Sequence, residues 1–151
     1  MDGRTTQGVI ARAILAVATI SNGVIGLWAT FSPRGFYDDF PGFGKVWVAV
    51  DGPFNEHLIR DVGAWSLGLT VLTLAAAWSL ERGLVLVAGL ALVLQNVPHA
   101  QYHLSAPNPF DSTSEQVQSV SGIVLLAVLG AVVAVLAWRS PGATRGPERG
   151  G

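Results

Sequence analysis

The sequence predicts an all-α membrane protein, a bundle of four transmembrane helices with a long aromatic-rich extracytoplasmic loop between helices 1 and 2. Half of the residues are hydrophobic and only 13% are charged, about half the charged share of an ordinary soluble domain. The hydrophobic residues gather in four windows of roughly 22 residues, and a helix needs about 20 to cross a bilayer. These windows are residues 9–31, 58–80, 83–104 and 117–138. Residues 1–138 are therefore expected to form a single membrane domain.

The first window is expected to be a retained span and not a signal peptide. Its apolar stretch, residues 13–31, is longer than the roughly 7–15 residues of a signal-peptide core, and no small-residue cleavage site follows it. The second and third windows are separated only by residues 81–83, so we expect these two helices to be antiparallel neighbours. The last segment, residues 139–151, is rich in glycine, proline and charge and is expected to be a disordered cytoplasmic tail.

The basic residues predict that both termini lie in the cytoplasm, because cytoplasmic loops carry an excess of Lys and Arg. One side of the predicted spans has six arginines: Arg4, Arg12, Arg82, Arg139, Arg145 and Arg149. The other side has three basic residues: Arg34, Lys45 and Arg60. The chain is therefore expected to be a multi-pass protein of the cytoplasmic (plasma) membrane, with residues 32–57 and 105–116 facing outward.

The long connection, residues 32–57, holds six of the thirteen aromatic residues: Phe36, Tyr37, Phe40, Phe43, Trp47 and Phe54. Connections of this length are uncommon unless they are functional, and Trp and Tyr favour the membrane interface. We therefore expect the connection to fold back over the mouth of the bundle as a lid, or to lie at the level of the lipid headgroups.

Polar residues gather at the predicted outer end of the second and third helices. Residues 55–61, NEHLIRD, open the second helix, and residues 98–104, PHAQYHL, close the third. The predicted polar layer consists of Asn22, Asn55, Glu56, His57, Arg60, Asp61, Gln95, Asn96, His99 and His103. Of these, Asn22, Asn55, Arg60, Gln95 and Asn96 are expected to contact a substrate or to hold the helices together through hydrogen bonds.

Residues four apart on a helix are neighbours, which pairs Glu56 with Arg60 and places His57 next to Asp61. Depth, counted at about 1.5 Å per residue from the ends of two antiparallel helices, further predicts two rungs between the helices. In these rungs His57 faces His103 and Asp61 faces His99. Because ionisable groups inside a span are costly, Arg60, Asp61 and His99 are expected to turn toward the bundle interior.

Two kinds of chemistry fit this layer. His99 and His103, four residues apart, have a spacing that suits a metal, and His57 with Asp61 or Glu56 would complete a set for zinc, manganese or non-haem iron. Haem held by two histidines is the weaker alternative, since such ligands usually lie across a bundle and not at its rim. Without a metal, Asp61 and His99 would act as a catalytic acid–base pair. The structural alternative is that the histidines are hydrogen-bonded and inert.

Several function classes are excluded by what the sequence lacks. It has no cysteine, which excludes disulfides and thiolate metal sites. The net charge of −1 and the lack of a basic cluster argue against nucleic-acid binding. No GxSxG, HExxH or phosphate-binding loop is present.

The stretch FPGFGKVWVAVDGPFNEHLIRDVGAWSLGL, followed by NVPHAQYHL, resembles small four-span membrane proteins of high-GC bacteria that are loosely similar to DoxX-like proteins. The resemblance covers residues 9–138 and is sharpest at residues 55–57, at residues 60–61, and at Pro98-His99 with His103. It implies a four-helix membrane bundle and supports treating these positions as the site. It implies no particular activity.

We expect the polar layer to bind or transform a small lipophilic molecule, with or without a metal. The alternative is an accessory or scaffold subunit of a larger membrane complex with no chemistry of its own, supported by the small size and the glycine-rich helix faces. The expected partners are the lipid bilayer, the small molecule, and another membrane protein or a second copy. A transporter is the third hypothesis, and it would need at least a dimer, because four spans are few for a transporter. The scarcity of polar groups in the inner half argues against a path through the monomer.

Overall fold

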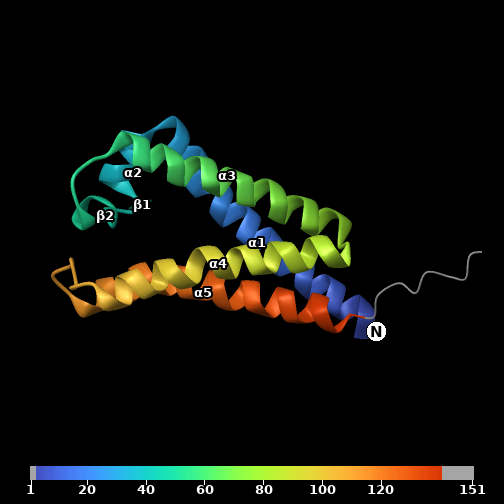
Figure 1. Cartoon of the computed structure of the whole chain (residues 1–151). Coiled ribbons are helices and arrows are strands. Elements are labelled where there is room, and N and C mark those ends of the chain that lie inside the picture. The colour runs from blue at the N-terminus through green and yellow to red at the C-terminus, as the bar shows by residue number, and fades with distance from the viewer. Residues whose placement is uncertain (1–2, 141–151) are drawn as a thin grey trace, which may run out of the picture.

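The computed structural model describes residues 3–140, and these fold into four long helices and one short helix (Figure 1). The long helices are α1 (Gly3–Phe31), α3 (Glu56–Ser79), α4 (Arg82–Ser105) and α5 (Thr113–Arg139), and the short one is α2 (Pro33–Asp39). All four long helices are long and apolar enough to span a membrane. The prediction of an all-α, multi-pass membrane protein is confirmed. The predicted disordered tail lies outside the described residues, except that Arg139 ends α5 and Ser140 follows it.

Side-chain caps fix where three of the long helices begin. The Asn55 side chain accepts a hydrogen bond from the Leu58 N–H at 3.1 Å, which starts α3. Ser112 does the same for α5. At α4 the Glu81 carboxylate accepts from the N–H groups of Gly83 and Leu84 at 2.9 and 2.7 Å. These bonds satisfy amides that have no partner within the helix. Asn55, expected in the polar layer, is thus a helix cap.

The helices form two closely packed pairs, α1 with α3 and α4 with α5, while α3 and α4 contact each other far less. The two helices still form the predicted antiparallel hairpin, joined by Leu80 and Glu81, and they share a core near that turn. Glycines explain the observed pairing. A Cβ added at Gly63 would lie 2.7 Å from the Thr30 nitrogen on α1, and one at Gly89 would lie 2.7 Å from the Ala134 nitrogen on α5. Glycine at these positions lets the two backbones touch.

An arginine ties each pair together at the same end. Arg12 of α1 donates from Nε to the Ala77 carbonyl of α3 at 3.0 Å. Arg82 of α4 donates from Nε to the Ala137 carbonyl of α5 at 3.0 Å, and from Nη2 to Trp138 at 3.2 Å. Both arginines therefore satisfy carbonyls in the last turn of a neighbouring helix, where a positive charge is favourable.

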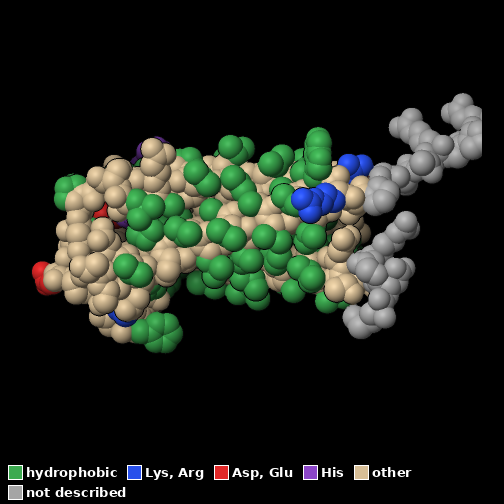
Figure 2. Space-filling view, turned by 90° about the horizontal axis from the view of Figure 1, so that it is seen from below, with side chains coloured by type: hydrophobic (Ala, Val, Ile, Leu, Met, Phe, Trp, Pro, Cys, Tyr) green, Lys and Arg blue, Asp and Glu red, His purple; other side chains and the backbone are tan. Residues whose placement is uncertain are grey.

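The two ends of the molecule differ in how the pairs meet. At the turn end, where Leu80 and Glu81 join α3 to α4, all four long helices share one core that includes Leu15, Ala76, Ala88 and Val133. Toward the loop end, where residues 32–55 and 106–112 connect the helices, α3 and α4 diverge (Figure 1). Figure 2 shows hydrophobic side chains over the middle of the visible face and basic side chains at the turn end, while the loop end carries both acidic and basic side chains.

The connection between α1 and α3 has structure of its own. After α2 it forms a short hairpin of β1 (Pro41–Gly42) and β2 (Lys45–Val46), then the 3-10 helix η1 (Ala49–Asp51). The Trp28 ring of α1 lies 6.0 Å from Phe36 and 6.1 Å from Phe40 of α2, between ring centroids. Phe36 is buried against Ala29 and Ile59. The connection is thus folded back onto the loop end of the α1–α3 pair.

Candidate functional site

The polar residues that open α3 pair with each other on that helix. Arg60 Nε donates to Glu56 Oε1 at 2.8 Å, and His57 Nε2 lies 3.3 Å from Asp61 Oδ2. Arg60 Nη1 also donates to the Thr30 carbonyl of α1. The predicted pairing four residues apart is confirmed. Arg60 and Asp61 are nevertheless exposed and do not turn toward the interior, because the buried residues of α3, among them Ile59, Gly63 and Ser66, lie on a different face of the helix.

The predicted rungs between α3 and α4 do not form. His57 pairs with Asp61 and not with His103, and Asp61 is not the partner of His99. Among residues 3–140 no three His, Cys, Asp or Glu side chains come together in a group that could hold a metal. The predicted metal set of His57, His99, His103 and Glu56 is therefore not assembled, because the two helices that carry it diverge at the loop end.

A different chain of polar groups forms at the loop end of α4. His103 Nε2 lies 3.1 Å from His99 Nε2, and His103 Nδ1 lies 3.9 Å from Asp51 Oδ2 on η1. The side chain of His103 is mostly buried, with 16% of its surface exposed. Asp51, His103 and His99 thus form a carboxylate–imidazole–imidazole sequence, which we call the Asp-His-His chain. Sequence reasoning missed Asp51 as its third member, because the fold of the connection and not a helical spacing brings Asp51 to α4.

The charge of the Asp51 carboxylate favours one pair of tautomers for the two rings. A contact of 3.1 Å between two imidazole nitrogens requires one to donate and the other to accept. The separation of 3.9 Å is longer than a hydrogen bond but within ion-pair distance, and the charge of Asp51 favours a hydrogen on the near nitrogen, Nδ1 of His103. His103 Nε2 then accepts from the Nε2–H of His99. This leaves Nδ1 of His99 as a free acceptor.

Amide side chains continue along α4 from His99 toward the middle of the helix. Gln95 is four residues before His99, so it lies on the same side of α4. Its Oε1 is buried and has no hydrogen-bond partner within residues 3–140. Asn96 is buried and donates to its own helix, to the Leu92 carbonyl at 2.8 Å. Asn22 of α1 likewise donates to its own helix. The two asparagines were predicted to hold the helices together, but the hydrogen bonds that they donate stay within their own helices.

The connection contacts both helices of the second pair at the loop end. Asp51 approaches His103 of α4, and Lys45 Nζ donates to Gln118 Oε1 of α5. The same connection is packed on α1 and α3 through its aromatic rings. It therefore joins the two helix pairs where their own contacts are weakest.

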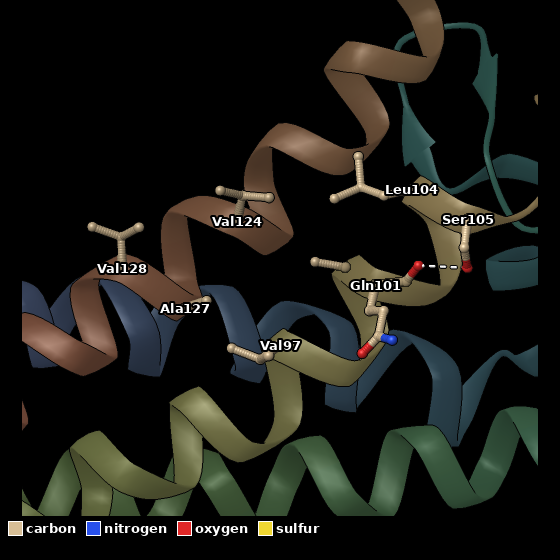
Figure 3. Close-up of a pocket in the computed structure, with 8 residues that line it drawn as sticks. Val97, Gln101, Leu104, Ser105, Val124, Ala127 and Val128 are labelled. Carbon is tan, nitrogen blue, oxygen red and sulfur yellow. Dashed lines mark hydrogen bonds between the residues drawn. The ribbon is translucent and has the colours of Figure 1, made fainter.

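A shallow groove of about 420 Å³ lies between α4 and α5 (Figure 3). It is lined mainly by aliphatic side chains such as Val97, Leu104, Val124 and Val128. Gln101, at its rim, is two residues from His99, so the two side chains point to nearly opposite sides of α4. The groove is thus separate from the Asp-His-His chain.

Comparison of the chain with protein-family models, with curated proteins and with solved structures finds no match. The resemblance to DoxX-like proteins stays a prediction.

Proposed function

We propose that this protein binds a small lipophilic molecule at its loop end, in the outer leaflet of the cytoplasmic membrane, and holds the polar group of that molecule by a hydrogen bond to the Asp-His-His chain. The observation that carries this proposal is the contact of 3.1 Å between His99 and His103 with Asp51 behind it. Ionisable groups brought together within membrane-spanning segments are costly and are usually functional.

Each member of the chain has a distinct role in the proposal. His99 is exposed and contacts the molecule, and its Nδ1 accepts a hydrogen bond from the polar group of that molecule. His103 accepts from the Nε2–H of His99 and so holds the His99 ring in place. The Asp51 carboxylate orients His103 and acts as a positioning residue. Asp61, predicted as the acid partner of His99, has no part in this contact, and no metal is required.

The three histidines provide a direct test, because His57 serves as an internal control. In protein labelled with ¹⁵N-histidine and placed in lipid nanodiscs, we expect His103 as the Nδ1–H tautomer and His99 as the Nε2–H tautomer. Asp51→Asn should shift the ring signals of His103 and His99 but not those of His57. Asp61→Asn should shift the ring signals of His57 but not those of His99 and His103. If the ring signals of His99 and His103 are the same in Asp51→Asn as in the wild type, the Asp-His-His chain is refuted.

The binding part of the proposal has its own test. Organic extracts of the purified protein are compared by mass spectrometry for the wild type and for the His99→Ala, Asp51→Asn and His57→Ala variants. We expect a bound small molecule that is lost from the first two variants and kept by His57→Ala. The same extract composition in all four proteins would contradict a site at His99.

The orientation follows from the distribution of basic residues, and the lack of cysteine makes it simple to test. Phe43 is fully exposed at the tip of the β1–β2 hairpin, and Thr6 is exposed at the start of α1. In intact cells a membrane-impermeant maleimide should label Phe43→Cys and leave Thr6→Cys unlabelled until the cells are lysed. The reverse pattern would place the loop end in the cytoplasm.

The second candidate is an accessory subunit of a larger complex, and one observation favours it. Asp61 is 61% exposed one turn into α3, and a Cβ added at Gly68 on the same helix would meet nothing within 4 Å. This face of α3 is open to another helix. Loss of a stoichiometric membrane-protein partner in Gly68→Leu, with the histidine signals unchanged, would favour this candidate over the first.

A further inference from the structure

One side of α3 changes from buried to exposed along its length. Leu58, Val62, Trp65, Leu69, Leu72 and Ala76 follow one another at spacings of four and three residues, so they share one side of the helix. Near the turn end Leu69 and Ala76 are buried, and Leu72 packs on the core that includes Val85 and Ala88 of α4. Near the loop end the side chains of this stripe are uncovered.

The uncovered part of the stripe consists of Leu58, Val62 and Trp65, whose exposed fractions are 59%, 43% and 62%. Because the same stripe faces α4 at the turn end, its exposure at the loop end follows from the divergence of the two helices (Figure 1). An apolar surface on α3 thus opens directly to the lipid.

The matching side of α4 changes in the same way but ends in polar groups. Ala88, near the turn end, is fully buried in the shared core. Gln95, His99 and Tyr102 continue the same side of α4 at spacings of seven, four and three residues, and His99 and Tyr102 are exposed. His99, the exposed end of the Asp-His-His chain, therefore lies on the side of α4 that carries Ala88 near the turn end.

The polar groups on this side of α4 are acceptors. Gln95 Oε1 is buried and lacks a donor within the described residues. His99 Nδ1 is the free acceptor of its ring in the tautomer that Asp51 favours. An acceptor left unpaired in a buried place is unfavourable, so a ligand that brings a hydroxyl donor is preferred. The Asp51 carboxylate, 3.9 Å from His103, disfavours a second negative charge.

We propose that the uncovered stripe of α3 binds the apolar tail of a neutral amphiphile, and that the head of this amphiphile is a hydroxyl group that lies between Gln95 and His99. The inference rests on the proposed function and names the class of its ligand, a lipophilic alcohol that comes laterally from the bilayer. Leu58, Val62 and Trp65 contact the tail. The Gln95 and His99 acceptors share the hydroxyl donor.

The test uses 9,10-dibromo-octadecanol, because bromine quenches tryptophan fluorescence at short range. Controls are its methyl ether, which lacks the donor, and 9,10-dibromostearate, which carries a charge. In nanodiscs we expect saturable quenching by the alcohol at mole fractions about tenfold lower than for the ether or the carboxylate, as one hydrogen bond worth about 1.4 kcal/mol predicts. Trp65→Phe should remove most of this quenching, whereas Trp138→Phe, at the turn end, should leave it unchanged.

Gln95→Leu, which keeps the size of the side chain, should bring the alcohol and the ether to within about twofold of each other. Equal quenching by all three probes in the wild type, or an unchanged preference in Gln95→Leu, would overturn the hydroxyl assignment. If the alcohol shifts the ¹⁵N signals of His99 but quenches Trp65 no more than Trp138, the binding surface on α3 is wrong and the proposed function stands. If the Asp51→Asn variant shows no histidine effect, the proposed function itself fails.

Discussion

The close packing of α4 on α5 makes Gly89→Ala a sharp test of the pairing. A Cβ at Gly89 would lie 2.7 Å from the Ala134 nitrogen and 2.8 Å from the Gly130 oxygen, about 0.7 Å inside the 3.4 Å at which ordinary contacts begin. Both atoms belong to backbone, so no side chain can rotate away and the helices must separate. Forcing a group into a packed interface in this way is unfavourable by roughly 1–3 kcal/mol.

The matched control is Gly122→Ala on α5, where an added Cβ meets nothing within 4 Å. Both changes gain the same helix propensity, up to about 1 kcal/mol in water. Reversible unfolding in mixed detergent micelles should therefore give a free energy of unfolding about 2 kcal/mol lower for Gly89→Ala than for Gly122→Ala. Equal stabilities of the two variants would refute the backbone contact between α4 and α5, and with it the two-pair arrangement.

Three further predictions concern single contacts. Arg82→Gln should lower the free energy of unfolding by about 1 kcal/mol, because it removes hydrogen bonds to carbonyls at the end of α5, and amide exchange should speed up there but not in α1. Thr73→Val removes the hydrogen bond of 2.9 Å between the hydroxyl groups of Thr19 and Thr73. It should lower the free energy of unfolding by only about 0.6 kcal/mol, the average for such bonds in membranes. A decrease above roughly 2 kcal/mol, measured by unfolding in detergent, would contradict this. Hydrogen bonds from the Gly83 and Leu84 amides lower the pKa of the Glu81 carboxyl below its ordinary 4.5. The stability that this cap contributes is thus complete above pH 4.5 and is lost as the pH falls through the lowered pKa. In this pH range the free energy of unfolding of the wild type should therefore fall more than that of Glu81→Gln. The same pH dependence in both proteins would contradict the cap.

The four spans could be predicted from the sequence, whereas the pairing of the helices could not. Length and hydropathy decide whether a helix crosses a bilayer, and these are local properties. The neighbours of each helix depend on which face packs, and membrane-spanning helices are apolar on the lipid side as well. The short turn at Glu81 predicts an antiparallel hairpin of α3 and α4, but it does not reveal that each of them packs more closely on another helix. The glycines at 63 and 89 carried the better signal, since glycine is needed where two backbones touch.

The candidate site was predicted in part for a similar reason. The pairs on a single helix, such as His57 with Asp61 and His99 next to His103, follow from the spacing of four residues. The contact of Asp51 with His103 depends on the path of a connection that contains α2, a hairpin and η1. No spacing rule relates a residue at the end of such a path to a helix of the other pair. For this reason helical spacing predicts Asp61 of α3 as the acid of the histidines on α4, whereas the acid beside them is Asp51 of η1.

The pairing has a consequence for how the protein is made. Each closely packed pair consists of two successive long helices, α1 then α3 and α4 then α5, so its contacts are complete before the next pair leaves the ribosome. The contacts of the first pair at Gly63 and at Arg12 involve no residue of 82–139, so they can form before all of those residues have left the ribosome. Insertion then proceeds as two helical hairpins in sequence, and only the docking of one finished hairpin on the other remains after translation ends.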